Sequence, residues 1–430
     1  MIHISTSFAL LVVAIIILVC IAGSRLSGRL GVPTLFIFIM LGMLFGSDGI
    51  FKIPFGNFAL AEQVCSVALI FIMFYSGFGT RWSEAKPVAG RSILLSSAGV
   101  VLTAFLTGLF CHLVLKMALM EGMLLGAVLG STDAASVFSI LRSRKLNLKY
   151  GTASMLELES GSNDPFAYMM TVILLSAMTG SVSGGSAVLL LIRQLAFGLL
   201  TGAAVAWLVT WLLKRYAFYG EGFDTIFVFA AAIISYALAS QIGGNGYLSV
   251  YLTGIILGNQ ELKNQKALVG FFDAFTGMMQ MLLFFLLGLL AFPSQMPSIV
   301  LPAIAIALFL TFVARPAAVG LLLAPSKPPI GQYLVISWAG LRGAASIVFA
   351  IMATLSEGYM KHDIFHIVFC VVLFSIIFQG SLLPKVAEKC DMIDNSTDVM
   401  RTFSDYTGDM QIQFVQLPIG DNHPWKNRKI

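Results

Sequence analysis

Long apolar runs joined by short polar connections recur along most of this 430-residue chain. A helix needs about 20 mostly apolar residues to cross the hydrocarbon core of a bilayer, and the runs that meet this demand predict about thirteen spans. They lie near residues 5–23, 33–47, 60–77, 92–115, 119–141, 151–179, 187–213, 223–240, 246–258, 270–291, 299–323, 331–354 and 364–384. The expected fold class is an all-α polytopic membrane protein that lies in a lipid bilayer.

The composition excludes most other classes of protein. Hydrophobic residues make up 58% of the chain and charged residues only 11%, whereas soluble domains are roughly 25% charged. A net charge of +5 diluted over such a chain does not make a nucleic-acid-binding surface. The sequence offers no nucleophile and base pair, metal-binding cluster or cofactor loop, so neither an enzyme nor a bound cofactor is expected.

Basic residues in the connections predict the orientation of the chain. Fourteen Lys and Arg residues lie in the odd-numbered connections and three in the even-numbered ones, and short cytoplasmic loops collect such residues. The N-terminus is therefore expected outside the inner (plasma) membrane and the tail in the cytoplasm. Residues 1–384 are expected to form the transmembrane domain. Residues 385–430 are expected to form a cytoplasmic segment, in which residues 411–417 alternate as in a strand.

Six ionisable side chains are concentrated in the interior of the spans, where each costs about 2.5–3.5 kcal/mol unless it is paired or reaches water. They are Asp133 in the fifth span, Glu157, Glu159 and Asp164 in the sixth, Arg315 in the eleventh and Arg342 in the twelfth. Glu157 lies on nearly the opposite side of its helix from Glu159. A structural role, or a place near the interface, is favoured for it.

The sixth span carries the densest polar pattern. Ser160 and Asp164 are four residues apart, as are Glu159 and Asn163, so two polar rows run along one side of a helix. Pro165 cannot bond to the carbonyl four residues earlier, which adds a backbone oxygen to the nearby carboxylate and hydroxyl. Hard cations take oxygen ligands of this kind. Asp164 is therefore the candidate for binding an ion.

Polar, glycine-containing interruptions occur in the middle of two spans. Residues 130–133 (Gly-Ser-Thr-Asp) interrupt the fifth span, and residues 340–343 (Gly-Leu-Arg-Gly) interrupt the twelfth. Corresponding breaks are typical of transporters built from inverted repeats, in which two discontinuous helices cross at the binding site. An acid and an arginine at such breaks can neutralise the exposed helix ends. For Asp133, capping a broken helix and contacting the ion are equally favoured.

These motifs resemble those of cation/proton antiporters of the NhaP type over about residues 5–384. The matching motifs are Glu-Ser-Gly-x-Asn-Asp at residues 159–164, Thr132 with Asp133, and Gly-Leu-Arg-Gly at residues 340–343. The resemblance implies a thirteen-helix homodimer with a dimerisation domain and a moving core. It also implies exchange of K⁺ or Na⁺ for H⁺.

Carried over residue by residue, the resemblance makes Asp164 the carboxylate that binds either the cation or the proton. Ser160 and Thr132 become further ligands beside Asp133. Asn163 stands where electrogenic relatives carry a second aspartate, which implies electroneutral exchange.

The resemblance also implies supporting roles. Glu159 is expected to form an ion pair with Arg342 that holds two helices together, and Arg315 resembles a family arginine of the eleventh span. Where many relatives carry an acid near the end of the third span, this sequence has Tyr75, whose phenol stays neutral near pH 7. The tail resembles the start of the RCK C-terminal (TrkA-C) module of potassium/proton antiporters. Resemblance to that module favours K⁺ over Na⁺ as the transported cation. It also implies regulation by a small cytoplasmic ligand such as a nucleotide.

The predicted mechanism is competition at one carboxylate. Burial favours the protonated form of an acid and a bound cation favours the charged form, so Asp164 can hold a proton or a cation in turn. Two alternatives remain. One is a cation channel without proton coupling, in which polar residues line a continuous pore; the other is a membrane sensor that does not transport.

Overall fold

The computed structural model describes residues 6–30, 33–144, 146–181, 184–215, 222–262, 264–358 and 360–394. Within these residues the regular structure is helical, apart from one isolated antiparallel bridge between Leu148 and Ile393. The prediction of an all-α fold is confirmed. The strand expected at residues 411–417 lies outside the described residues.

The helices follow the predicted spans closely. The first half of the chain contains α1 (Thr6–Leu30), α2 (Thr34–Phe45), α3 (Phe58–Gly79), α4 (Trp82–Ala85), α5 (Ala89–Leu113), α6 (Leu119–Val128), α7 (Ala134–Ser143) and α8 (Thr152–Met178). The second half contains α9 (Gly184–Arg215), α10 (Phe223–Gln241), α11 (Gly246–Gly258), α12 (Gln265–Leu290), α13 (Met296–Phe309), α14 (Arg315–Leu323), α15 (Ile330–Trp338), α16 (Ala344–Thr354), α17 (Ile364–Phe374) and α18 (Gly380–Lys389). A π-helical turn, Leu310–Ala314, joins α13 to α14, and another, Ser375–Gln379, joins α17 to α18.

Among the described residues, seven helical stretches are long and apolar enough to cross a membrane. They are Phe58–Gly79, Ala89–Leu113, Gly184–Arg215, Phe223–Gln241, Gln265–Leu290, Pro293–Ser326 and Ile364–Lys389. Shorter apolar helices, such as α2, α6, α11 and α16, occupy other predicted spans. The total of thirteen spans stays a prediction, because a short helix can end inside the bundle without crossing the bilayer.

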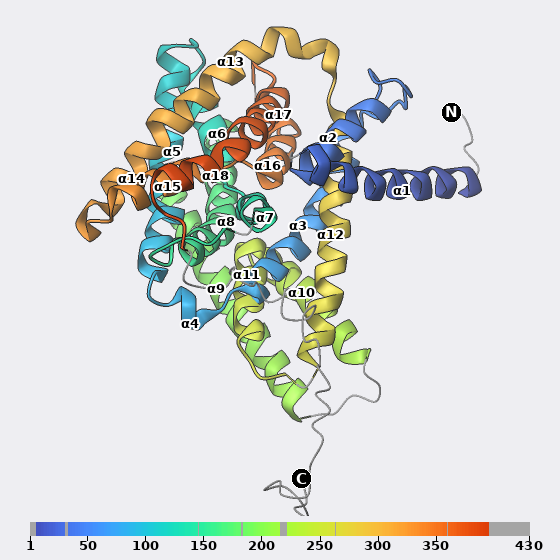
Figure 1. Cartoon of the computed structure of the whole chain (residues 1–430), viewed down its shortest axis with the longest axis vertical. Helices are drawn as coiled ribbons and strands as arrows, with labels where there is room; N and C mark the ends of the chain where they lie inside the picture. Colours follow the sequence, from blue (N-terminus) through green and yellow to red (C-terminus); the bar gives the residue numbers. More distant parts are fainter. Residues whose placement is uncertain are drawn as a thin grey trace, which may run out of the picture.

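The helices form two packed groups (Figure 1). In the first group, α3 packs against α11 and α12, with α2, α9 and α10 beside them. In the second, α8 packs against α5 and α6, and α13 to α18 complete the group. Small residues allow close approach within the first group: a Cβ added at Gly77 of α3 would overlap the carbonyl of Tyr251 on α11.

Both predicted helix breaks are present beside α8. The chain leaves α6 at Val128 and enters α7 at Ala134, and it leaves α15 at Trp338 and enters α16 at Ala344. The two non-helical segments meet, because the backbone N–H of Asp133 donates to the carbonyl of Leu341 at 2.7 Å. Non-helical backbone at this depth is tolerated where protein groups satisfy it or where it lines a cavity.

Candidate ion-binding site

Side chains of α8 hold the non-helical segment between α6 and α7. The Ser160 hydroxyl donates to the Thr132 carbonyl at 2.7 Å and accepts from the Ala134 N–H at 2.9 Å. The Asn163 amide donates to the Thr132 hydroxyl at 2.5 Å and accepts from the Thr132 N–H at 3.3 Å. Backbone groups that the break removes from the helix ladder are thereby satisfied by α8.

Asp164 lies one turn beyond Ser160 on the same face of α8, as their spacing predicted. Its carboxylate accepts a hydrogen bond from the Ser131 hydroxyl. Only 6% of Asp164 is exposed, and it borders a cavity. Sequence reasoning did not single out Ser131. Its place next to Thr132 in the polar interruption is the signal that could have found it.

Asp133 caps the N-terminus of α7. Its carboxylate accepts from the Ser136 N–H at 3.2 Å and from the Ser136 hydroxyl at 2.5 Å. A carboxylate at this position also interacts favourably with the positive end of the helix dipole. Gly343 of the second break lies directly against it, because a Cβ at Gly343 would come within 2.8 Å of Asp133 Oδ2. Asp133 borders the same cavity as Asp164, so the capping role does not exclude contact with an ion.

Arg342 neutralises the other side of the first break. Its guanidinium donates to the carbonyl of Leu129, which caps the C-terminus of α6, and to the carbonyl of Ser131 at 3.3 Å. Its backbone N–H donates to the Ser375 hydroxyl at 3.0 Å. Carbonyl groups at a helix C-terminus attract a cation. An acid and an arginine therefore neutralise the ends of α7 and α6, as predicted, although the arginine comes from the second break.

The predicted ion pair between Glu159 and Arg342 is wrong. Glu159 pairs with Arg315 instead, with Arg315 Nη1 2.5 Å from Glu159 Oε1 and Nη2 2.9 Å from Oε2. The two side chains are 1% and 6% exposed. The physical reason is that Arg342 is already bound to carbonyls of the α6 terminus. Arg315, which begins α14 after the π-helical turn, lies within reach of the acid.

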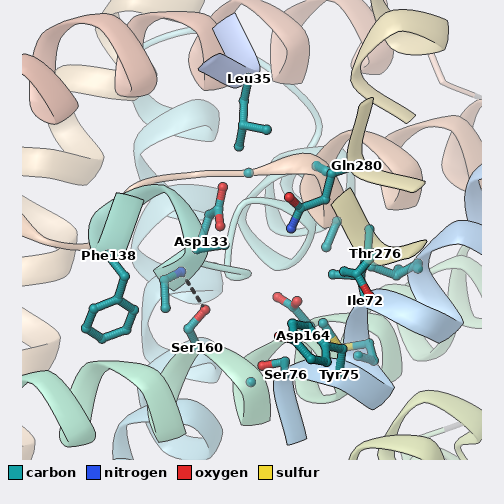
Figure 2. A pocket seen from close by; sticks show the side chains of 18 of the residues that line it. Leu35, Ile72, Tyr75, Ser76, Asp133, Phe138, Ser160, Asp164, Thr276 and Gln280 are labelled. Carbon is teal, nitrogen blue, oxygen red and sulfur yellow. Dashed lines mark hydrogen bonds between the residues drawn. The ribbon is translucent and has the colours of Figure 1, made fainter. Parts of the chain in front are cut away.

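A cavity of about 560 Å³ lies between the two groups of helices (Figure 2). Asp133, Glu157, Ser160 and Asp164 border it on the side of α7 and α8. The facing wall includes Ile72, Tyr75 and Ser76 of α3 and Asp273, Thr276 and Gln280 of α12. Figure 2 shows the side chains of Asp133, Asp164 and Gln280 reaching into the same space. Because a liquid water occupies about 30 Å³, the cavity has room for a cation with several waters.

Sequence reasoning did not place two acids of the cavity wall. Glu157 borders the cavity, since seven residues separate it from Asp164 and put both on one face of α8; a structural or interfacial role was expected for it. Asp273 of α12 borders the cavity as well, and it accepts a hydrogen bond from the Tyr75 hydroxyl at 3.0 Å. Tyr75 therefore belongs to the cavity wall, where it contacts an acid that no motif marked.

Residues 14–389 match the family described as "Sodium/hydrogen exchanger, transmembrane". The chain belongs to this family. The K(+)/H(+) antiporter NhaP of Alkalimonas amylolytica is 36% identical over 89% of this chain and 66% of its own length. The K(+)/H(+) antiporter NhaP2 of Shewanella oneidensis is 35% identical over 88% of this chain and 66% of its own length. This exchanger-family chain therefore spans just under two thirds of the length of these relatives.

Solved structures show the same exchanger fold. The structure of the sodium proton antiporter MjNhaP1 from Methanocaldococcus jannaschii at pH 8 matches with a TM-score of 0.77 at 22% identity. The match covers 89% of this chain and 99% of that chain. The NhaP-type fold that the motifs implied is confirmed.

Proposed function

We propose that this chain is a secondary antiporter that exchanges K⁺ or Na⁺ for H⁺, with Asp164 binding the cation and the proton alternately. The observation that carries the proposal is the position of this acid. Asp164 is 6% exposed, lies beside the crossing of two broken helices and borders a cavity between two helix groups. A crossing of this kind is where secondary transporters bind their ions.

Oxygen atoms around Asp164 suit an alkali cation. The Thr132 carbonyl accepts from Ser160, and a carbonyl oxygen with two lone pairs keeps one for an ion. Ser160 and Thr132 border the cavity beside the acid, and Asp133 adds a second carboxyl group to the same wall. We therefore propose Thr132 and Ser160 as ligands beside Asp164, with Asp133 as an electrostatic partner and Asn163 as the residue that fixes Thr132.

Competition at Asp164 would couple the two fluxes. Burial of a carboxyl group favours the protonated form, whereas the hydrogen bond donated by Ser131 favours the charged form. Both states are therefore within reach, and one carboxylate cannot hold a proton and a cation together. Asn163 is neutral and does not carry a second proton. The exchange would therefore be one proton for one monovalent cation, which moves no net charge.

The relatives suggest which cation is transported and how the chain is arranged in the membrane. Two relatives at 35–36% identity are named K(+)/H(+) antiporters, whereas the Na(+)/H(+) antiporter ApNhaP of Aphanothece halophytica is 24% identical over 80% of this chain. These identities support K⁺ as the cation. We place residues 1–384 as a homodimeric unit of the inner membrane with its N-terminus outside. Residues 385–430 would lead into a cytoplasmic RCK-like regulatory module that takes a nucleotide.

The test is transport by the 430-residue chain in proteoliposomes that carry a preset pH gradient. KCl or NaCl, but not choline chloride, is expected to dissipate the gradient, and clamping the voltage should not change the rate. Asp164→Asn should abolish the response. Glu261→Gln, which removes an exposed acid outside the cavity wall, should preserve it. Cation flux without a pH change would indicate a channel, and absence of flux would indicate a sensor; either result overturns the proposal.

A further inference from the structure

We propose that Asp273 of α12 is a second cation-binding residue of the cavity, and that Tyr75 of α3 positions it. Asp273 would receive the monovalent cation on the wall that faces Asp164. The inference rests on the proposed antiport function, because it assigns a further residue to the same ion path.

The contact with Tyr75 fixes the carboxylate in the cavity wall. The Tyr75 hydroxyl donates to Asp273 Oδ1 at 3.0 Å across the interface of α3 and α12, and both residues border the cavity. A charged carboxylate offers about four acceptor positions, so a single hydrogen bond leaves oxygen available to a cation. The bond also holds the side chain in one place, which reduces the entropy lost when an ion binds.

The sequence of α12 supports a path rather than an isolated surface acid. Between residues 271 and 284 the polar side chains are Asp273, Thr276 and Gln280, and the other positions are Phe, Ala, Gly, Met and Leu. Spacings of three and four residues put the polar side chains on one helix face. All three border the cavity. The single polar face of this otherwise apolar segment is therefore the face that meets the ion space.

Asp273 and Asp164 differ in their access to solvent. Asp273 is exposed and lies about two turns from the start of α12, at the end of this helix that follows one of the basic connections predicted to be cytoplasmic. Asp164 is 6% exposed. A carboxylate that faces solvent in a cleft raises the local concentration of cations. A cation that enters from this end would therefore meet Asp273 before it reaches the buried carboxylate.

The test is the dependence of transport rate on cation concentration in the proteoliposome assay. Asp273→Asn keeps the size of the side chain and its acceptor oxygen but removes the charge. We expect the KM for the cation to rise about fivefold, roughly 1 kcal/mol, with the maximal rate and the unfolding temperature unchanged. Tyr75→Phe should raise the KM by a smaller factor, and the double variant should match Asp273→Asn, because Tyr75 acts through Asp273.

Glu261→Gln is the matched control, since it removes an exposed acid near the start of α12 that does not border the cavity. Its KM should equal that of the wild type. An unchanged KM in Asp273→Asn, or an equal rise in Glu261→Gln, overturns the binding role. Additive effects in the double variant overturn the positioning role of Tyr75. Failure of the wild type to transport would instead overturn the proposed function, so the two failures are distinguishable.

Discussion

Two buried acids of α8, Glu159 and Asp164, lie five positions apart and meet opposite surroundings. Five residues turn a helix by about 140°, so the two side chains face different neighbours. Glu159 is 1% exposed and forms an ion pair with Arg315 inside the second group of helices, which contains α8. Asp164 accepts a hydrogen bond from the neutral Ser131 hydroxyl and borders the cavity.

The comparison shows two ways in which a membrane protein keeps an acid at depth. A fixed cation neutralises Glu159 permanently, so this residue can hold helices together but is not available to a transported ion. Asp164 has no arginine among the partners that the described residues give it, and it reaches a cavity. A proton or a mobile cation can therefore neutralise its charge, as the proposed exchange requires.

The largest expected effect is on stability, from breaking the fixed pair. Glu159→Gln leaves the guanidinium of Arg315 buried without its counter-ion, which should destabilise the protein by about 3–5 kcal/mol. Asp164→Asn removes a charge whose partner is a hydroxyl, so its unfolding temperature should stay near that of the wild type. Thermal unfolding in detergent measures both variants side by side.

The double variant Glu159→Gln, Arg315→Met is the control for this prediction. Removing both charges should recover most of the lost stability, because no unpaired ion remains buried. Equal unfolding temperatures for Glu159→Gln and Asp164→Asn would contradict the distinction between the two acids.

A smaller loss is expected from Ser160→Ala. This change leaves the Thr132 carbonyl and the Ala134 N–H without their bonds to α8, at a cost of about 1–3 kcal/mol. Transport should fall as well, because the break would no longer be held beside Asp164. Thr171→Ala is the matched control on the same helix, since the bond that the described residues give its buried hydroxyl goes to the Ala167 carbonyl one turn away. A similar loss in both variants would show that the contact with the break has no special importance.

The smallest of the three effects expected around α8 is on affinity, from Ser131→Ala. Loss of the donated hydrogen bond weakens the charged form of Asp164, so the proton competes better and the KM for the cation should rise about tenfold, the low end for a bond to a charged group. Raising the pH should restore transport, and Ser131→Thr should keep the wild-type KM. Cation titrations at two pH values provide the measurement. A KM that rises equally at both pH values would contradict a role in this competition.

Local patterns predicted a large part of the site. The two breaks were visible because glycine and polar residues interrupt apolar runs at residues 130–133 and 340–343. The shared face of Ser160 and Asp164 follows from helical spacing alone. These features depend on neighbours along the chain, and the structure agrees with each of them.

Contacts between distant helices could not be predicted in the same way. Two buried arginines were available to Glu159, and the choice of Arg315 depends on the carbonyls of α6 that bind Arg342. The sequence pattern does not mark Asp273, because it lies only three residues inside the predicted span 270–291. An acid at such a place can reach the polar surface of the membrane. Its contact with Tyr75 depends on how α12 packs against α3, which no spacing in either helix reveals.

The most direct test of the central claim is proton release upon cation binding. Purified protein in weakly buffered detergent solution is titrated with KCl while the pH is recorded, with choline chloride as the ionic-strength control. If Asp164 exchanges a proton for a cation, KCl should acidify the wild-type solution in a saturable manner, and Asp164→Asn should give no signal. Cation binding without acidification, or equal acidification by the variant, would contradict the account.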